Sequence, residues 1–227
     1  MLEPEGSLLA GSTVRWRAFF NEAKQRRGAA GCPTAENDAR RIVEQASGFD
    51  GSDFLVALEE FATKRGVVAF DAMIARRLTG EPLQYVLGRW GFRSLDLMVD
   101  HRVLIPRPET EVVAGIAIEE VDRLSGAGVV TVVDLGTGSG AIGLSVAAER
   151  AGSEVVLTDA PAEALQVARA NLAGLGRSGT RVSIASGSWF EALGAQLRDS
   201  VHVIVSNPPY VAETDELPDD VRGWEPS

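Results

Sequence analysis

The 227-residue sequence contains one cysteine, two histidines and no long hydrophobic run. Because a disulfide needs two cysteines, Cys32 cannot form one within the chain, and two histidines are too few for an ordinary zinc site. No segment approaches the roughly 18 consecutive apolar residues of a membrane helix, and residues 1–5 lack the basic and apolar parts of a signal peptide. With 45% hydrophobic residues, the chain is expected to be a soluble, cytoplasmic protein without a bound metal.

Basic residues are scarce in the second part of the chain. Residues 1–80 contain 11 basic and 11 acidic residues, whereas residues 81–227 contain 11 basic and 21 acidic ones, which accounts for the net charge of −10. An acidic surface repels phosphate groups. We therefore expect no stable binding of nucleic acid. We also expect a monomer that binds no membrane.

Helical periodicity dominates the first 82 residues. Apolar residues recur at helical spacing after Thr34 and end at Gly48; a second helix is expected from Ser52 to Gly66 and a third before Gly80. Trp16 belongs to a further helix at the start. These segments predict a small all-helical domain, because short amphipathic helices must bury their apolar faces against one another.

Strand patterns begin after residue 82. Trp90 and Phe92 alternate with polar or small residues, as do Leu95, Leu97 and Val99, and a turn is expected at Arg93-Ser94 between them. This pattern predicts a β-hairpin. Residues 106–111 then lead into a helix that ends near Gly126. Strands and helices alternate from there to residue 206, which indicates a parallel sheet with right-handed crossovers. The four expected strands cover residues 129–134, 154–158, 181–185 and 201–206.

The motif Asn207-Pro208-Pro209-Tyr210 follows directly after the last expected strand. Open α/β sheets bind ligands at the carboxyl ends of their strands. Prolines lack an N–H, so the carbonyls here are not drawn into a continuing ladder. A substrate –NH2 group can donate one hydrogen bond to the Asn207 side-chain oxygen and another to the Pro208 carbonyl, which predicts chemistry on a planar amide or amine nitrogen. The alternative is a plain strand stop with Asn207 capping the turn.

A glycine-rich loop joins the first strand of the sheet to its helix: Asp134-Leu135-Gly136-Thr137-Gly138-Ser139-Gly140. Its glycines allow a tight turn and the close approach of a nucleotide-like cofactor. Residues 138–143 form a formal G-x-G-x-x-G motif with Asp159 at a suitable distance, as in nicotinamide-dependent dehydrogenases. Asp134 favours S-adenosylmethionine instead, because a carboxylate attracts the ammonium group of that cofactor and repels a pyrophosphate. Both aspartates could instead have a purely structural role. Asp134 could be a strand-end carboxylate whose hydrogen bonds are all made within the protein, and Asp159 could cap the next helix.

Five motifs in sequence order resemble those of the release factor glutamine methyltransferases, the PrmC/HemK family. They are residues 80–85 (Gly-Glu-Pro-Leu-Gln-Tyr), residues 104–111 (Leu-Ile-Pro-Arg-Pro-Glu-Thr-Glu), the glycine loop, Trp189-Phe190 and the motif at 207–210. The resemblance implies an α/β protein with a Rossmann-like class I methyltransferase sheet preceded by a small all-helical domain. It implies a helical domain at 1–82 that recognises the release factor, a hairpin linker at 83–105 and a methyltransferase domain at 106–227.

The same resemblance implies a reaction of translation termination and the residues that carry it. A methyl group would pass from S-adenosylmethionine to the side-chain amide nitrogen (N5) of the glutamine in the Gly-Gly-Gln motif of class 1 peptide-chain release factors. The implied cofactor-binding residues are Asp134, Gly136, Thr137, Gly138, Ser139, Gly140, Asp159, Trp189 against the adenine, and Asn207. The implied catalytic and substrate-binding residues are Asn207, Pro208, Pro209 and Tyr210, with Arg107 and Glu109 lining the same cleft.

Two departures from the family pattern stand out. Ser188 occupies the position before Trp189, where many members have an acid that meets the adenine amino group. The chain also stops at Ser227, before the last strands of the family's seven-stranded sheet, so we expect an incomplete sheet. Two alternatives for the function remain: a methyltransferase that acts on the base amine of a nucleic acid, and a non-catalytic binding module.

Overall fold

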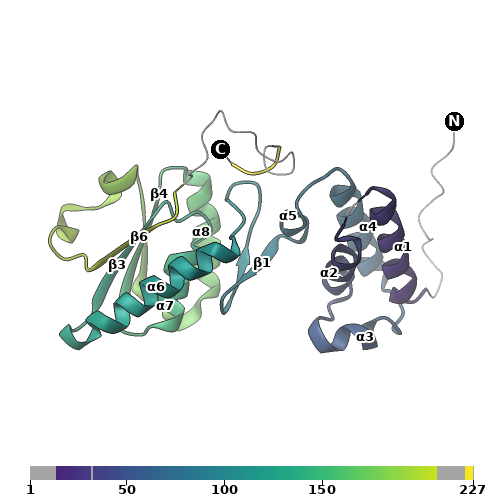
Figure 1. The fold of residues 1–227 in the computed structure, drawn as a ribbon, viewed down its shortest axis with the longest axis horizontal. Coiled ribbons are helices and arrows are strands. Elements are labelled where there is room, and N and C mark those ends of the chain that lie inside the picture. The colour runs from purple at the N-terminus through teal and green to yellow at the C-terminus, as the bar shows by residue number, and fades with distance from the viewer. Residues whose placement is uncertain (1–13, 32, 209–222, 227) are drawn as a thin grey trace. The chain divides into compact units, whose positions relative to one another are not determined.

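The structure, a computed structural model, describes residues 14–31, 33–208 and 223–226 (Figure 1). The chain divides into two compact units, Met1–Leu87 and Gly88–Ser227. Their boundary lies inside the segment assigned above to a linker, and the domain assignment itself stays a prediction. Within the described part of the chain, no helix is long and apolar enough to cross a membrane.

The described residues of the first unit form mainly short α-helices, as the periodicity of this part predicts. They are α1 (Trp16–Ala29), α2 (Ala35–Ser47), α3 (Phe54–Ala57), α4 (Lys64–Leu78) and α5 (Leu83–Leu87). Trp16 and Phe19 of α1 and Phe70 of α4 are almost fully buried. The ring of Phe19 lies 5.4 Å from that of Trp16 and 5.1 Å from that of Phe70, between centroids. These aromatic contacts form the centre of a separate hydrophobic core.

The helix expected from Ser52 to Gly66 is wrong in length. A 3-10 turn (Gly51–Asp53) and α3 replace it. The carbonyls of Leu58 and Glu60 accept hydrogen bonds from the first amides of α1, so they are not available to extend the helix. Gly66 instead lies in the first turn of α4, where a Cβ atom would come within 2.7 Å of the Trp16 ring.

The second unit begins with the predicted hairpin, which the structure confirms. Strands β1 (Arg89–Phe92) and β2 (Leu95–Met98) pair antiparallel with Phe92 opposite Leu95. Arg93 forms the turn with a φ of 50°, a left-handed conformation that few residues with a side chain adopt.

The main sheet of the second unit confirms the predicted parallel architecture. Its strands are β3 (Val130–Leu135), β4 (Ser153–Asp159), β5 (Val182–Ser186) and β6 (Val203–Ser206), each within two residues of its predicted ends. They pair in parallel in the order β5-β4-β3-β6. The chain therefore moves outward from β3 to β5 and returns to the other side of β3 as β6. This reversal creates a switch point between β3 and β6, where α/β sheets bind their ligands.

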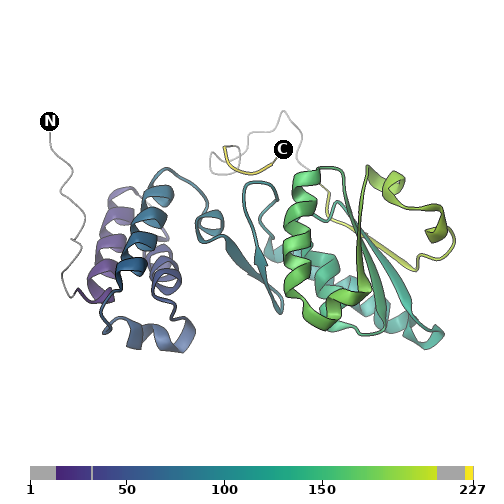
Figure 2. The same cartoon turned by 180° about the vertical axis from the view of Figure 1, so that it is seen from behind.

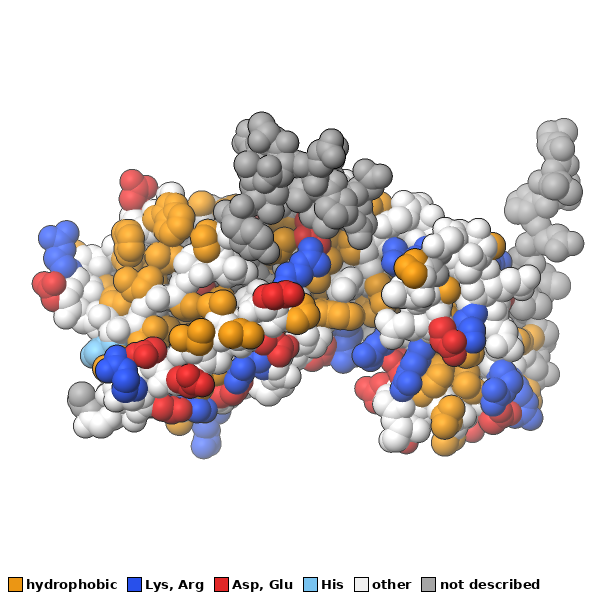
Figure 3. Space-filling model, viewed as in Figure 1, with side chains coloured by type: hydrophobic (Ala, Val, Ile, Leu, Met, Phe, Trp, Pro, Cys, Tyr) orange, Lys and Arg blue, Asp and Glu red, His pale blue; other side chains and the backbone are white. Residues whose placement is uncertain are grey.

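Three helices cover one face of this sheet: α6 (Pro108–Leu124), α7 (Ala141–Glu149) and α8 (Ala162–Gly174) (Figure 2). Alternate residues of β3 and β4, such as Val132 and Leu157, point into the core that these helices form. Val133 and Val156 point to the opposite face, where they pack against Leu193 and neighbouring residues of the segment after β5. Apolar side chains are visible at the surface of this unit (Figure 3). Val112 of α6 is 64% exposed.

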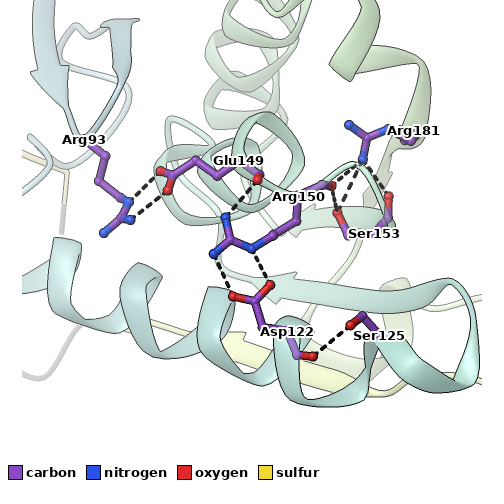
Figure 4. Close-up of polar contacts among 7 residues, drawn as sticks. All are labelled: Arg93, Asp122, Ser125, Glu149, Arg150, Ser153 and Arg181. Atoms are coloured by element: carbon purple, nitrogen blue, oxygen red, sulfur yellow. Dashed lines mark hydrogen bonds and ion pairs between the residues drawn. The ribbon is translucent and has the colours of Figure 1, made fainter.

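Ion pairs and hydrogen bonds connect several elements of the second unit near the carboxyl end of α7 (Figure 4). Arg93 of the hairpin turn donates two hydrogen bonds of 2.8 Å to the Glu149 carboxylate, and it holds the pKa of that carboxyl below its usual range. Arg150 binds Asp122 of α6 through two further hydrogen bonds, and Arg181 donates to the carbonyl of Arg150 at 2.8 Å. The hairpin, α6, α7 and the start of β5 are thereby tied together, while the carboxyl ends of the strands point the other way.

Candidate active site

The glycine loop lies at the carboxyl end of β3, at the switch point. Gly136, Gly138 and Gly140 have φ values of 69°, 54° and 86°, which glycine adopts without strain. The amide of Thr137 donates to the carbonyl of Thr158 at the end of β4 (2.9 Å), so the loop is fixed to the neighbouring strand. The result is a rigid turn that a ligand can approach without meeting a Cβ atom.

Asp134 lies beneath this loop and is 1% exposed. Its Oδ2 atom accepts hydrogen bonds from the Thr137 hydroxyl (2.7 Å) and from the Gly143 amide (3.0 Å). Its Oδ1 atom is buried and has no hydrogen-bond partner among the described residues. Burial raises the pKa of Asp134 from 3.8 to about 6, although the two hydrogen bonds act in the opposite direction. A buried carboxylate with one unsatisfied oxygen is suited to a cationic group bound near the loop.

Asp159 ends β4 beside the same loop and is half-buried. Its Oδ2 atom accepts a hydrogen bond from the Gly138 amide (2.8 Å), and its Oδ1 atom accepts one from the Ala160 amide (2.9 Å). These bonds fix the carboxylate at the edge of the loop, and each oxygen keeps a lone pair for a further donor such as a hydroxyl.

Trp189 follows β5 in an unusual conformation. It has a φ of 48° and is 56% exposed, and both features are uncommon for a large aromatic residue. The amide of Gly187, two residues earlier, donates to the Asp159 carbonyl at 3.1 Å, which fixes this turn to the end of β4. The structure therefore holds an exposed indole next to the strand end that carries Asp159.

Asn207 comes directly after β6. Because Ser206 pairs with Leu135, Asn207 and the glycine loop begin at the same edge of the sheet. The Nδ2 atom of Asn207 donates to the hydroxyl of Thr110 on α6 at 3.1 Å. The sheet thus brings together the glycine loop and the asparagine that the sequence analysis assigned to one site. Pro209 and Tyr210 lie outside the described residues.

Arg107 and Glu109, predicted to contact the substrate, have different surroundings. Arg107 precedes α6 and donates from Nη2 to both carboxylate oxygens of Glu225, at 2.6 and 2.8 Å. The Glu225 side chain is only 3% exposed, whereas Glu109 is exposed on the first turn of α6. Sequence reasoning missed Thr110 and Glu225. Thr110 lies within the motif at residues 104–111, and Glu225 lies after the motif at residues 207–210. A contact with a residue far away in the sequence gives no local signal.

Comparisons with known proteins now decide the family. Two family models match, the PrmC N-terminal domain over residues 19–88 and the methyltransferase small domain over residues 121–221. A release factor glutamine methyltransferase from Bifidobacterium longum is 39% identical over 221 residues, which cover 92% of this chain and 74% of that protein. The chain belongs to the release factor glutamine methyltransferase family. Membership in this family removes the dehydrogenase alternative for the glycine loop.

Other relatives match a smaller part of their own length. The release factor glutamine methyltransferase of Xylella fastidiosa is 44% identical over 147 residues, which cover 65% of this chain and 50% of that protein. Among solved structures, the N-terminal domain of human METTL16 in complex with SAH has a TM-score of 0.42 and 14% identity, covering 69% of this chain and 58% of that chain. The chain thus spans between half and three quarters of the length of these two curated relatives.

Proposed function

We propose that this chain transfers a methyl group from S-adenosylmethionine to the side-chain amide nitrogen of the glutamine in the Gly-Gly-Gln motif of a class 1 peptide-chain release factor. The observation that carries the proposal is that β3 and β6 pair up to Leu135 and Ser206, the residues directly before the glycine loop and Asn207. An acceptor for an amide –NH2 group and a loop suited to a nucleotide-like cofactor are thereby neighbours. Family membership supports the same reaction.

The residues of the loop fit S-adenosylmethionine. The buried Asp134 supplies negative charge without an exposed carboxylate, which suits an ammonium group and disfavours a phosphate. Asp159 is placed to accept hydrogen bonds from ribose hydroxyls, and the exposed Trp189 ring offers a face for the adenine. Ser188 leaves adenine recognition to other groups. When bound, this cofactor supplies an electrophilic methyl group on a sulfonium.

Asn207 and Pro208 orient the nucleophile. An amide nitrogen is a poor nucleophile because its lone pair is delocalised into the carbonyl. If the Asn207 Oδ1 atom and the Pro208 carbonyl each accept a hydrogen bond from the substrate –NH2, the nitrogen is held in one pose, with its lone pair toward the transferring methyl group. Such positioning contributes much of the rate in a bimolecular transfer. The proton can leave to water after the methyl group has arrived, so the reaction needs no strong general base.

The helical unit is the part of the chain that matches the PrmC N-terminal domain. We assign it to recognition of the release factor, with Pro209 and Tyr210 completing the glutamine pocket. Arg107 and Glu109 line the approach to this pocket from the start of α6. None of these assignments requires a metal ion.

Transfer of a labelled methyl group tests the proposal. The chain is incubated with S-adenosylmethionine, labelled on its methyl group, and either a release factor or its variant with the motif glutamine replaced by alanine. Label on the first protein only, resistant to nuclease, is the expected result. Equal labelling of both proteins would refute the glutamine assignment. Nuclease-sensitive label would point to a nucleic-acid base as the substrate.

A further inference from the structure

The side-chain amide of Asn207 is anchored away from the glycine loop. Its Nδ2 atom donates to the hydroxyl oxygen of Thr110, 3.1 Å away, although the two residues are 97 positions apart in the sequence. Thr110 is 7% exposed and lies in the first turn of α6, while Asn207 is half-buried after β6. The hydrogen bond therefore joins the start of a helix to the end of a strand at the proposed site.

In the structure the Thr110 hydroxyl accepts from Nδ2, and this leaves the other end of the Asn207 amide for the substrate. An asparagine side chain has an acceptor oxygen and a donor –NH2 group on opposite sides. With Nδ2 on Thr110, the oxygen is the atom left to face the pocket. In the opposite orientation, the –NH2 of Asn207 would face the –NH2 of a substrate amide, and two donors cannot bond to each other.

We propose that Thr110 is a positioning residue that holds Asn207 in the acceptor-forward orientation required for methylation of an amide nitrogen. The inference rests on the proposed function and adds to it a residue that does not itself touch the reacting atoms. It also favours a substrate group that can donate a hydrogen bond, since the oriented Asn207 turns its acceptor oxygen to the pocket.

The first turn of α6 gives Thr110 a fixed place. Pro108 begins the helix, and the Thr110 amide donates to the Arg107 carbonyl at 3.0 Å. Arg107 is in turn bound to the nearly buried Glu225 carboxylate. The buried Thr110 side chain is therefore carried by the first turn of a helix, and the residue before that helix is held by an ion pair. An orienting group must have a fixed position of this kind.

Two matched variants separate the hydroxyl from the shape of the side chain. Thr110→Ser keeps the hydroxyl and loses a methyl group, whereas Thr110→Val keeps the shape and loses the acceptor. Thr110→Ala replaces Thr110→Val if valine prevents folding, which thermal unfolding will show.

The first readout does not depend on activity. The chain has four asparagines, so a protein labelled with ¹⁵N at asparagine gives few side-chain amide signals, and Asn207→Asp identifies the signal of Asn207. We expect this signal to exchange slowly with water in the wild type and in Thr110→Ser, and faster in Thr110→Val. An unchanged exchange rate in Thr110→Val would overturn the proposal.

The second readout is methyl transfer to the release factor. Loss of a single orienting hydrogen bond should lower kcat roughly 10-fold in Thr110→Val, with the affinity for S-adenosylmethionine unchanged and Thr110→Ser close to the wild type. Equal kcat in the wild type and Thr110→Val, or an equal loss in the valine and serine variants, would refute the positioning role. The two failures are distinguishable. If the wild type transfers no methyl group to the release factor, but the exchange rate of the Asn207 amide signal still changes in Thr110→Val, the proposed function is wrong and the orienting hydrogen bond is confirmed.

Discussion

Replacing Asp134 by asparagine removes a charge that the folded protein buries at a cost. The asparagine oxygen can still accept the hydrogen bonds from Thr137 and Gly143 that the carboxylate accepts. Its –NH2 group would occupy the place of the Oδ1 atom, which has no partner among the described residues. The substitution therefore combines two effects, removal of a buried charge and addition of an unsatisfied donor, and only the first depends on pH.

The pH dependence isolates the charge and gives its magnitude. Because the pKa of Asp134 rises from 3.8 to about 6 on folding, folding takes up a proton in this window. The contribution of Asp134 to the free energy of unfolding is thus most favourable at low pH and falls as the pH rises toward 6. Above about pH 6, the ionised Asp134 carboxylate lowers the free energy of unfolding by roughly 3 kcal/mol relative to the protonated form. About half of it, roughly 1.5 kcal/mol, develops between about pH 5 and about pH 7.5.

The assay is urea unfolding of both proteins at these two pH values. We expect the stability of Asp134→Asn relative to the wild type to improve by about 1.5 kcal/mol at the higher pH. Asp122→Asn is the matched control. A hydrogen bond from Arg150 lowers the pKa of Asp122, so the difference between this variant and the wild type should be flat over this range.

Calorimetry completes the test with S-adenosylmethionine. Asp134→Asn should bind this cofactor several-fold more weakly than the wild type, because the buried negative charge near the ammonium group is lost. A stability difference that does not change with pH would refute the account of a charged, buried Asp134. An unchanged cofactor affinity would remove this carboxylate from the proposed cofactor site.

Two further predictions concern packing and the ion pair beside the site. Gly143→Ala places a Cβ atom 2.2 Å from the Leu157 side chain and should lower the free energy of unfolding by about 1–3 kcal/mol. Gly115→Ala is the control: the nearest atom to its Cβ lies at 3.5 Å, and it should raise the free energy of unfolding by up to about 1 kcal/mol. Equal effects of the two variants in urea unfolding would contradict the close packing at Gly143. Arg107→Glu and Glu225→Arg should each destabilise the protein by about 1–3 kcal/mol, because each leaves a like-charge pair at this position. The double variant should recover stability and methyl transfer; recovery of stability alone would mean that Arg107 contacts the substrate directly.

The sheet could be predicted from the sequence because its signals are local. Runs of β-branched residues, the glycine loop and the alternation with helices fix the four strands, and all lie within two residues of their expected ends. The glycine loop and Asn207 follow β3 and β6, whose carboxyl ends meet at the switch point. The roles assigned to the individual residues of the site stay predictions.

Partners distant in the sequence could not be predicted. The bond between Thr110 and Asn207 depends on how α6 packs beside β6, and nothing near either residue signals it. Nothing near Glu225 in the sequence signals that its carboxylate binds Arg107. Gly66 was read as a helix stop because glycine often ends helices, but packing against an aromatic ring also selects glycine.

Mass spectrometry of the release-factor peptide that contains the Gly-Gly-Gln motif tests the central claim most directly. The wild-type chain and Asn207→Ala are compared under single-turnover conditions with saturating S-adenosylmethionine. The account predicts one added methyl group on the glutamine side chain, formed about 100-fold more slowly by Asn207→Ala although its cofactor affinity is retained. A methyl group on another residue, or equal rates for the two proteins, would contradict it.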